Sequence, residues 1–344
     1  MSRGRSARRY GRRWLTLGLA LAAGMTLAAC RPQSPPGAIR GAIVADGSST
    51  VFPLTEAMAE AFAREHPGVQ VTVGTSGTGG GFQRFCRGET ALNNASRPIK
   101  PSEIEACRAH GIDFIEIPVA YDGITVVVHP DNEFVDHLTV AELRRIWEPG
   151  SPIRRWRQVR PTWPDRELHL YGPGSDSGTF DYFTEAVIGE SGRSRSDYTA
   201  SEDDHQLVIG VSGDPDALGY FGYAYYVENR GRLRAVPIDG GEGPVPPTEE
   251  TIRSGRYRPL SRPLFIYVST KAVERPEVQA FVRFYLEHAD ELVKEVGYVP
   301  LSATAYQQAR RRFDERITGT MFGEGSAGEL SLEERLARSQ RGSR

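Results

Sequence analysis

The 344-residue chain has only three cysteines and shows no excess of either charge. It carries 42 basic and 44 acidic residues, a formal net charge of −2, whereas nucleic-acid-binding proteins usually show a clear basic excess. Hydrophobic residues make up 39% and charged residues 25%, which excludes wholesale disorder and collagen-like repeats. The length allows about two domains.

The chain also lacks an N-terminal apolar run long enough to span a membrane. The sixteen uncharged residues 14–29 fall short of the roughly 20 that a spanning helix requires. Six arginines and no acidic residue precede or adjoin this run, a pattern typical of a secretory signal peptide. The run ends in Leu-Ala-Ala-Cys, which resembles the lipobox of bacterial lipoproteins and predicts a lipidated Cys30. The alternatives are an ordinary signal peptide with a chance cysteine, or an uncleaved anchor.

Removal of residues 1–29 changes the charge of the remaining chain. Without their six arginines, 36 basic residues face 44 acidic ones, a net charge of −8. Residues 30–40 are rich in proline, serine and glycine and predict a flexible tether. The sequence therefore indicates an exported, acidic protein attached through its N-terminus.

Two cysteines remain after Cys30 is set aside. In an oxidising compartment, Cys86 and Cys107 would most simply form one disulfide; two free buried thiols are the alternative. Two cysteines alone cannot build a zinc site, and the seven histidines form no HExxH motif. We therefore expect neither a metal nor another cofactor.

Hydrophobic periodicity predicts an α/β fold. Strand-like segments alternate with helical ones, and residues 277–296 form a long amphipathic helix. The apolar run 207–211 is predicted as a strand, and the Gly-, Ser-, Glu- and Arg-rich tail 322–344 is predicted to be poorly ordered. No internal repeat is visible.

Three predicted strand-to-helix turns share one chemistry. They read Ser-Ser-Thr at 48–50, Thr-Ser-Gly-Thr at 75–78 and Ser-Asp-Ser-Gly-Thr at 175–179. A helix N-terminus offers unpaired N–H donors, glycine permits close backbone approach, and hydroxyls add rotatable donors, so each turn could hold an oxyanion. Serine and threonine are also the commonest N-caps, and a single such turn would carry no weight. Their recurrence favours one shared anion site.

The segment Asn-Asn-Ala-Ser-Arg-Pro at 93–98 supplies a cation. An arginine binds a tetrahedral anion through two N–H groups and stays ionised, which makes Arg97 a candidate ligand. The alternative is an ordinary surface arginine before a proline.

Motifs of the common hydrolases are absent. The middle residue of 174–178 is an aspartate, so the segment is not a GxSxG nucleophile elbow, and no lysine follows Gly79 to complete a phosphate-binding P-loop. These absences argue against a phosphatase or esterase.

A series of strings along the chain resembles the PstS family, the phosphate-binding proteins of bacterial phosphate ABC transporters. In order, the strings are DGSSTVFPLTEAM, GTSGTGGGFQRFCRGE, NASRPIK, AYDGITVVV, GSDSGTFDYF, SEDD and ALGYFGYAYY. The resemblance covers about residues 42–313, and the order and spacing are more specific than any single string. The Cys86/Cys107 pair also matches a disulfide of this branch.

The resemblance implies a periplasmic-binding-protein fold of type II, with two α/β lobes, a ligand cleft between them and two hinge crossings. The implied domains are a signal peptide (1–29), a lipidated Cys30 with its tether (30–40), lobe one (41–122 plus 263–321), lobe two (123–262) and a disordered tail (322–344). The crossings would lie near residues 121–123 and 260–263.

The resemblance also assigns phosphate ligands, all of them neutral or cationic donors. They are Ser49, Thr50 and Val51 in the first turn; Ser76, Gly77 and Thr78 in the second; Ser96 and Arg97 in the third segment; and Ser177, Gly178 and Thr179 in lobe two.

Two positions depart from the family pattern. The best-known members have an aspartate where Arg97 stands and an arginine before the lobe-two Ser-Gly-Thr. The aspartate accepts the proton of phosphate and thereby rejects sulfate, because two unpaired acceptors would otherwise face each other. Asp176 and the run Glu202-Asp203-Asp204 are candidates for this role, with ordinary solvated charges as the alternative.

The expected function is high-affinity binding of inorganic phosphate outside the cytoplasmic membrane by a monomeric, lipid-anchored receptor, which passes it to the transmembrane permease subunits of an ABC transporter. The alternatives are a receptor for sulfate, molybdate or arsenate, a secreted phosphatase-like enzyme, and a signalling or adhesion protein that kept only the fold. Because the overall field of a −8 protein repels a dianion, capture must rely on short-range donors and Arg97.

Overall fold

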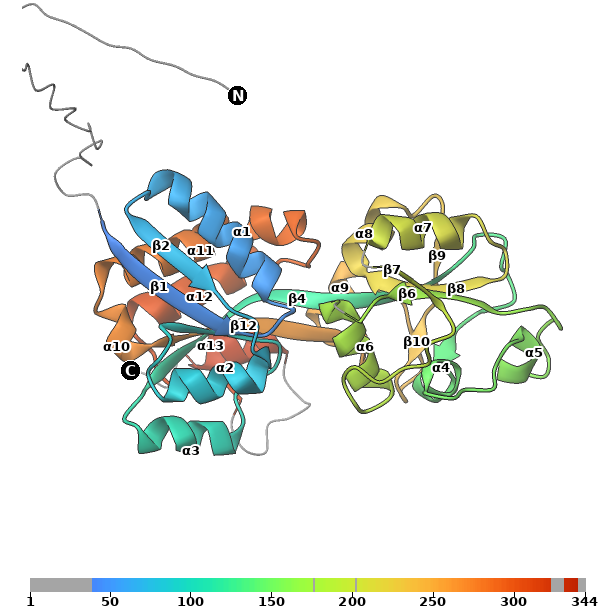
Figure 1. Cartoon of the computed structure of the whole chain (residues 1–344), viewed down its shortest axis with the longest axis horizontal. Helices are drawn as coiled ribbons and strands as arrows, with labels where there is room; N and C mark the ends of the chain where they lie inside the picture. The colour runs from blue at the N-terminus through green and yellow to red at the C-terminus, as the bar shows by residue number, and fades with distance from the viewer. Residues whose placement is uncertain (1–38, 176, 202, 323–330, 340–344) are drawn as a thin grey trace, which may run out of the picture. The chain divides into compact units, whose positions relative to one another are not determined.

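Two long strands join two groups of elements into one main sheet (Figure 1). The structure is a computed structural model that describes residues 39–322, except 176 and 202, and residues 331–339. Within these residues the main sheet has nine strands in the order β2-β1-β3-β12-β4-β8-β6-β7, with β9 paired to β4, and a smaller sheet has the order β11-β10-β5.

The strands are β1 (Gly41–Gly47), β2 (Val69–Val73), β3 (Leu92–Ala95), β4 (Phe114–Val128), β5 (Leu138–Thr139), β6 (His169–Pro173), β7 (Thr199–Ser201), β8 (Ala217–Gly222), β9 (Arg234–Ala235), β10 (Ile238–Asp239), β11 (Pro244–Val245) and β12 (Ser261–Ser269). The helices are α1 (Phe52–Glu65), α2 (Gly77–Cys86), α3 (Pro101–Ala109), α4 (Val140–Trp147), α5 (Trp156–Val159), α6 (Gly178–Val187), α7 (Asp204–Ser212), α8 (Tyr223–Glu228), α9 (Glu249–Arg253), α10 (Thr270–Val273), α11 (Pro276–Glu295), α12 (Ala303–Asp314) and α13 (Leu332–Ser339).

Each lobe combines parallel strands with helices. In the first lobe β1 pairs in parallel with β2 and β3, and helices α1–α3 and α10–α12 surround them. In the second lobe β6 pairs in parallel with β7 and β8. Polar turns follow β1, β2 and β6, and α1, α2 and α6 follow those turns. The predicted α/β class is therefore confirmed.

The crossing strands β4 and β12 connect the lobes. They pair antiparallel from Phe114 to Gly123 of β4, and from Ile124 onward β4 pairs with β8 instead. All of β4 is buried. Residues 121–123, one of the two expected crossings, thus lie where β4 changes partners, and residues 260–263 lie at the start of β12.

A disulfide joins two helices of the first lobe. Cys86, the last residue of α2, bonds to Cys107 of α3 with an S–S distance of 1.98 Å. Both cysteines are almost fully buried. The predicted pairing is confirmed, and the two-thiol alternative is excluded.

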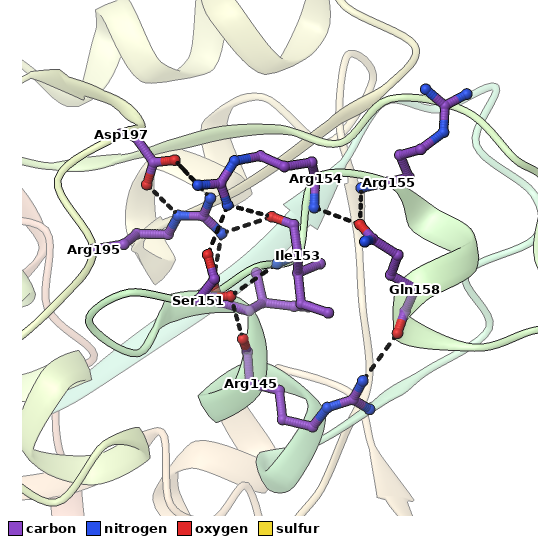
Figure 2. A network of polar contacts seen from close by, with 9 residues as sticks. Arg145, Ser151, Ile153, Arg154, Arg155, Gln158, Arg195 and Asp197 are labelled. Atoms are coloured by element: carbon purple, nitrogen blue, oxygen red, sulfur yellow. Dashed lines mark hydrogen bonds and ion pairs between the residues drawn. The ribbon is translucent and has the colours of Figure 1, made fainter.

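The arginine-rich segment of the second lobe is held by carbonyl groups rather than left free in solvent (Figure 2). The buried Arg195 donates to the carbonyl oxygens of Ile146 and Ile153, at 2.9 and 3.0 Å, and forms an ion pair with Asp197. Arg154 also pairs with Asp197, at 2.5 Å. The pKa of Asp197 is lowered, mainly by its hydrogen bond from Arg195. These contacts fix the loop between α4 and α5.

Aromatic side chains pack beneath this loop. Trp156 and Trp163 are buried, and their rings lie edge to face with 5.8 Å between centroids. Tyr220 is buried and stacks on Phe183 with 3.7 Å between ring centroids. Aromatic packing therefore fills the core of the second lobe.

Residues 207–211 are not a strand, contrary to prediction. They belong to α7, which begins where the Asp203 side chain accepts a hydrogen bond from the N–H of His205. Leu207, Val208 and Val211 are buried in a cluster with β8, so three of the apolar residues point to one side of a helix. A short apolar run does not by itself distinguish a buried strand from a buried helix, and here burial of one side of the segment goes with the helix.

The C-terminal tail is not wholly disordered, contrary to prediction. Helix α13 buries Leu332 and Leu336 against the main core, and these two leucines, one helical turn apart, make up its hydrophobic face. The Arg335 guanidinium lies 4.9 Å from the ring of Phe322. The helix was not predicted because only two of its eight residues are large and apolar, so the composition of the segment is polar.

The predicted signal peptide, Cys30 and most of the predicted tether lie outside the described residues. No helix in the described part of the chain has the length and apolarity needed to cross a membrane.

Candidate functional site

In the turn after β1, the hydroxyl of Ser48 accepts a hydrogen bond from the N–H of Val51 at 3.4 Å, whereas the hydroxyls of Ser49 and Thr50 do not cap the following helix. The N-cap of α1 is Val51, and no side chain caps the helix. Ser48 holds the turn through its N–H, which donates to the carbonyl of Asn94 at 2.9 Å. The simple N-cap interpretation therefore fails for Ser49 and Thr50.

The turn after β2 is tied to the end of β1. The carboxylate of Asp46 accepts hydrogen bonds from the N–H of Ser76 at 3.0 Å and of Gly47 at 2.7 Å, and it pairs with Arg84. Burial raises the pKa of Asp46, but these hydrogen bonds outweigh it and the pKa is lowered. Gly77 has φ 76°, a left-handed conformation that favours glycine at this position.

Ser76 also leaves its hydroxyl free of a capping role, because α2 has no side-chain cap. By contrast, Ser177 is a conventional cap of α6 and accepts from the N–H of Thr179 at 3.2 Å. The turns after β1 and β2 therefore carry hydroxyl groups that do not cap the helix that follows, unlike the turn after β6.

The predicted turns surround two neighbouring cavities. The first, of about 310 Å³, is lined by residues of both lobes, and it includes Ser49, Thr50, Gly77, Thr78, Ser96 and Arg97 among the predicted ligands. The second, of about 700 Å³, shares Ser49 and Gly77 with the first and adds Ser76, Ser177 and Gly178. The structure thus brings nine of the eleven predicted ligands to one region.

The remaining two predicted ligands do not line either cavity. Val51 has no solvent exposure and belongs to the core, and Thr179 is absent from both linings although its N–H caps onto Ser177. A role for these two residues through their backbone N–H groups stays a prediction.

The two lobes approach each other closely at Gly178. A Cβ atom at this position would lie 3.2 Å from three atoms of Thr50, namely its N, Cα and Oγ1. Such contacts are tighter than ordinary van der Waals packing. Glycine at the start of α6 therefore lets the second-lobe turn meet the first turn of the first lobe.

Arg97 lines the first cavity, but its charge is matched. Its guanidinium donates to both carboxylate oxygens of Glu103, at 2.7 and 2.9 Å, and to the carbonyl of Pro98. Glu103 also accepts from the N–H of Lys100 at the start of α3. This bidentate pair holds the Arg97 side chain in one orientation beside Thr78 and Ser96.

A second cation, Arg262, was missed by the sequence-based prediction. It stands near the start of β12, lines the first cavity and has 13% of its side chain exposed. Its Nη2 atom donates to Thr50 Oγ1 at 2.8 Å, and its guanidinium carbon lies 3.5 Å from the ring centroid of Tyr182.

Arg262 is paired with Asp122 of β4. Nε and Nη2 both contact Oδ2 of Asp122 at 3.3 Å. Burial raises the pKa of Asp122, and the charge of Arg262 only partly offsets that effect. Asp122 is one of two acidic residues, with Glu116, in the fully buried strand β4, and a carboxylate in such an apolar run was the signal that could have pointed to a buried partner.

Acidic side chains also line the site. Asp181, the fourth residue of α6, lines both cavities. Burial raises the pKa of its carboxyl group, although the hydrogen bond with Ser191 and the charge of Arg262 oppose this shift. Of the acidic residues proposed from sequence, Asp203 instead caps α7, and Asp176 and Glu202 lie outside the described residues.

The described residues contain no group of three or more His, Cys, Asp or Glu side chains arranged to hold a metal ion. The cavity instead combines hydroxyls, a helix N-terminus and two arginines, a donor set suited to an oxyanion.

Comparison with known proteins agrees with this donor set. Residues 32–288 match the model of the PBP superfamily domain. A phosphate-binding protein PstS from Staphylococcus saprophyticus is 37% identical over 311 residues, covering 89% of this chain and 96% of that protein. The chain belongs to the PstS family.

Two further relatives support membership in this family. The protein SphX of Synechococcus elongatus is 49% identical over 308 residues, covering 89% of this chain and 91% of that protein. The crystal structure of a possible phosphate-binding protein from Planctomyces limnophilus shares 49% identity, with a TM-score of 0.78, covering 80% of this chain and 99% of that one. The expected periplasmic-binding-protein fold, with two lobes and two crossings, is thereby confirmed.

Proposed function

We propose that this protein binds inorganic phosphate in the cavity between its lobes and delivers it to the permease of a phosphate ABC transporter. The observation that carries the proposal is the convergence of two donor turns, Ser96 and two arginines on a cavity of about 310 Å³, while Ser177 and Gly178 of the third turn line the neighbouring cavity. The names of the PstS relatives support the same ligand.

The proposed ligands are the hydroxyl and N–H donors of the turns together with Arg97. Ser49, Thr50, Val51, Ser76, Gly77 and Thr78 would donate from the first lobe with Ser96, and Ser177, Gly178 and Thr179 from the second. Neutral donors and cations replace the hydration shell of a desolvated anion, and no nucleophile or metal is required for capture and release. We therefore propose a binding protein without catalytic turnover, whose lobes are residues 41–122 plus 263–321 and 123–262.

Phosphate can be distinguished from sulfate by a carboxylate that accepts its proton. Asp181 is the candidate, because it lines both cavities and, among the described residues, accepts a hydrogen bond from Ser191 but forms no ion pair with an arginine. Sulfate has no proton at neutral pH and would face an unpaired carboxylate, which costs binding free energy. This residue replaces Asp176 and the 202–204 run as our proposed selectivity determinant.

Export and lipid attachment complete the proposal. The basic, then apolar N-terminus and Cys30 support an exported lipoprotein in the periplasm or at the cell surface, anchored to a membrane by its lipid. Bacterial lipoproteins carry more than one acyl chain, as stable attachment requires. The permease would contact the rims of both lobes of a monomeric receptor.

Isothermal titration of the purified protein with inorganic phosphate tests the proposal. We expect saturable binding at micromolar concentrations or tighter, and no hydrolysis of a generic phosphomonoester. Absence of phosphate binding, with binding of sulfate, molybdate or arsenate instead, would assign another oxyanion to the same site.

A further inference from the structure

Arg262 contacts three parts of the molecule at once. Its guanidinium donates to Thr50 of the first lobe, pairs with Asp122 of the crossing strand β4 and stacks on Tyr182 of α6 in the second lobe. Arg262 itself belongs to the other crossing strand, β12. The side chain thus lies where both lobes and both crossings meet, on the wall of the first cavity.

The contact with Thr50 determines where its hydroxyl proton points. Oγ1 of Thr50 accepts from Nη2 of Arg262 at 2.8 Å, so the hydroxyl hydrogen must point away from the guanidinium. The carbonyl of Thr50 accepts from the hydroxyl of Tyr298 at 2.6 Å, which fixes the backbone of the turn. Since Thr50 lines the cavity, its proton is available to an anion there.

The two arginines of the cavity differ in how strongly their charge is matched. Arg97 makes two short hydrogen bonds to separate oxygens of Glu103, at 2.7 and 2.9 Å. Arg262 reaches a single oxygen of Asp122 at 3.3 Å, and among the described residues its Nη1 has no hydrogen-bond partner. Both guanidinium groups make three hydrogen bonds, but Arg262 keeps the donor capacity of its whole Nη1 group for a ligand, and its charge is less closely matched than that of Arg97.

The position of Arg262 on the crossing strand β12 places its Nη1 donors next to both lobes. Tyr182 lies one turn beyond the Ser177–Gly178 donors on α6, and the guanidinium packs on its ring at 3.5 Å. An anion held by Nη1 of Arg262 would thus be bound by the same side chain that contacts both the first-lobe turn and the second-lobe helix.

We propose that Arg262 is the principal phosphate-binding cation of this protein and that it orients the Thr50 hydroxyl toward the ligand, with Asp122 as its positioning counter-ion. The inference rests on the proposed phosphate function and assigns that site a residue which the turn motifs do not contain.

Titration calorimetry with inorganic phosphate on the full chain tests this assignment. Arg262→Gln removes the charge and the fork of donors, and we expect its affinity to fall at least 100-fold. Arg262→Lys keeps the charge but loses the planar fork, so we expect an intermediate affinity, at least tenfold below wild type. The matched control is Arg230→Gln, because Arg230 also lies over a tyrosine ring, 5.9 Å from Tyr226, but lines neither cavity. Its affinity should stay within twofold of wild type.

The outcomes separate this inference from the proposed function. If wild type does not bind phosphate, the proposed function fails irrespective of Arg262. If wild type binds and a folded Arg262→Gln variant binds within threefold, Arg262 is not the principal cation. Should Arg262→Gln fail to fold, Arg262→Lys decides alone: a loss of tenfold or more supports the assignment, and affinity within threefold of wild type overturns it.

Discussion

The donor turns and the crossing strands contribute to one cavity in opposite ways. The turns at 48–50, 75–78 and 175–179 are local segments whose glycine and hydroxyl residues supply neutral donors next to helix N-termini. The crossing strands supply a buried ion pair, Arg262 with Asp122, from residues 140 positions apart. The donor turns are formed by residues that are neighbours in the sequence, whereas the ion pair of the crossing strands joins residues that are far apart in the sequence.

This difference separates two physical requirements of an anion site. Neutral donors can be placed on a turn at small cost, because their hydrogen-bonding groups are satisfied by water when no ligand is present. A cation on a buried strand needs a counter-ion to offset its desolvation, and only a neighbouring strand can provide one here. The four variants below test the comparison, from the largest expected effect to the smallest.

Truncation of Arg262 should cost the most stability. Arg262→Ala leaves Asp122, whose side chain is 3% exposed, without its partner, and we expect a loss of about 4 kcal/mol in the free energy of unfolding. Arg97→Ala leaves the more exposed Glu103 and should cost about 1 kcal/mol. Urea unfolding of both variants measures the difference, and equal losses would show that the crossing strands are no more dependent on pairing than the turns.

The Arg262→Ala effect should also depend on pH. Burial already raises the pKa of Asp122 above its ordinary value of 3.8, and loss of the nearby charge raises it further. The native variant then binds a proton more tightly than the unfolded chain, so its stability rises as the pH falls. The loss relative to wild type should be smaller at pH 5 than at pH 7, and a pH-independent loss would contradict this account.

Loss of packing by the tail helix should weaken the region behind the crossing strands. Leu336 is fully buried, and other residues of α13 line a cavity together with Arg262, Pro263 and Tyr182. Leu336→Ala should cost about 3 kcal/mol in the free energy of unfolding. Ile209→Ala is the control, because Ile209 is 53% exposed and its truncation should cost less than about 0.5 kcal/mol. Thermal and urea unfolding report both values, and similar values for the two variants would show that α13 does not stabilise the fold.

A side chain at Gly178 should weaken ligand binding more than stability. The added Cβ of Gly178→Ala would press on the backbone of Thr50 and widen the approach of the two lobes. We expect phosphate affinity to fall about tenfold, which corresponds to about 1.4 kcal/mol. Gly231→Ala provides the control, since a Cβ there meets nothing within 4 Å. Calorimetric titration of both variants would refute the close-approach argument if their affinities were the same.

The smallest change in phosphate affinity is expected at Asp181. Asp181→Asn removes the carboxylate acceptor, so phosphate binding should weaken roughly threefold while sulfate binding strengthens. Glu185→Gln, one helical turn away on α6 and also lining the first cavity, should leave selectivity unchanged. Competition between phosphate and sulfate measures the ratio. An unchanged ratio in Asp181→Asn would assign proton acceptance to another group.

Much of the site could be predicted because it is encoded locally. Glycine and hydroxyl residues between a strand and a helix mark a donor turn wherever they occur, and nine of the eleven predicted ligands line the two cavities. The Cys86–Cys107 disulfide followed from the odd cysteine at position 30 and was confirmed. Residues 207–211 and the tail helix α13 were predicted wrongly, because burial on one side, not composition, made them helical.

The sequence by itself determined the α/β class, the cysteine pair and the segments that carry anion donors, because strand periodicity, cysteine count and turn chemistry are properties of neighbouring residues. Tertiary structure alone decided that Arg97 is neutralised by Glu103, that Gly178 abuts Thr50, and that Arg262 and Asp122 meet beside the cavity. Hydrogen bonds and ion pairs depend on distances of a few ångströms, and the pairing of β4 with β12 is what brings Asp122 and Arg262, 140 positions apart, within that range.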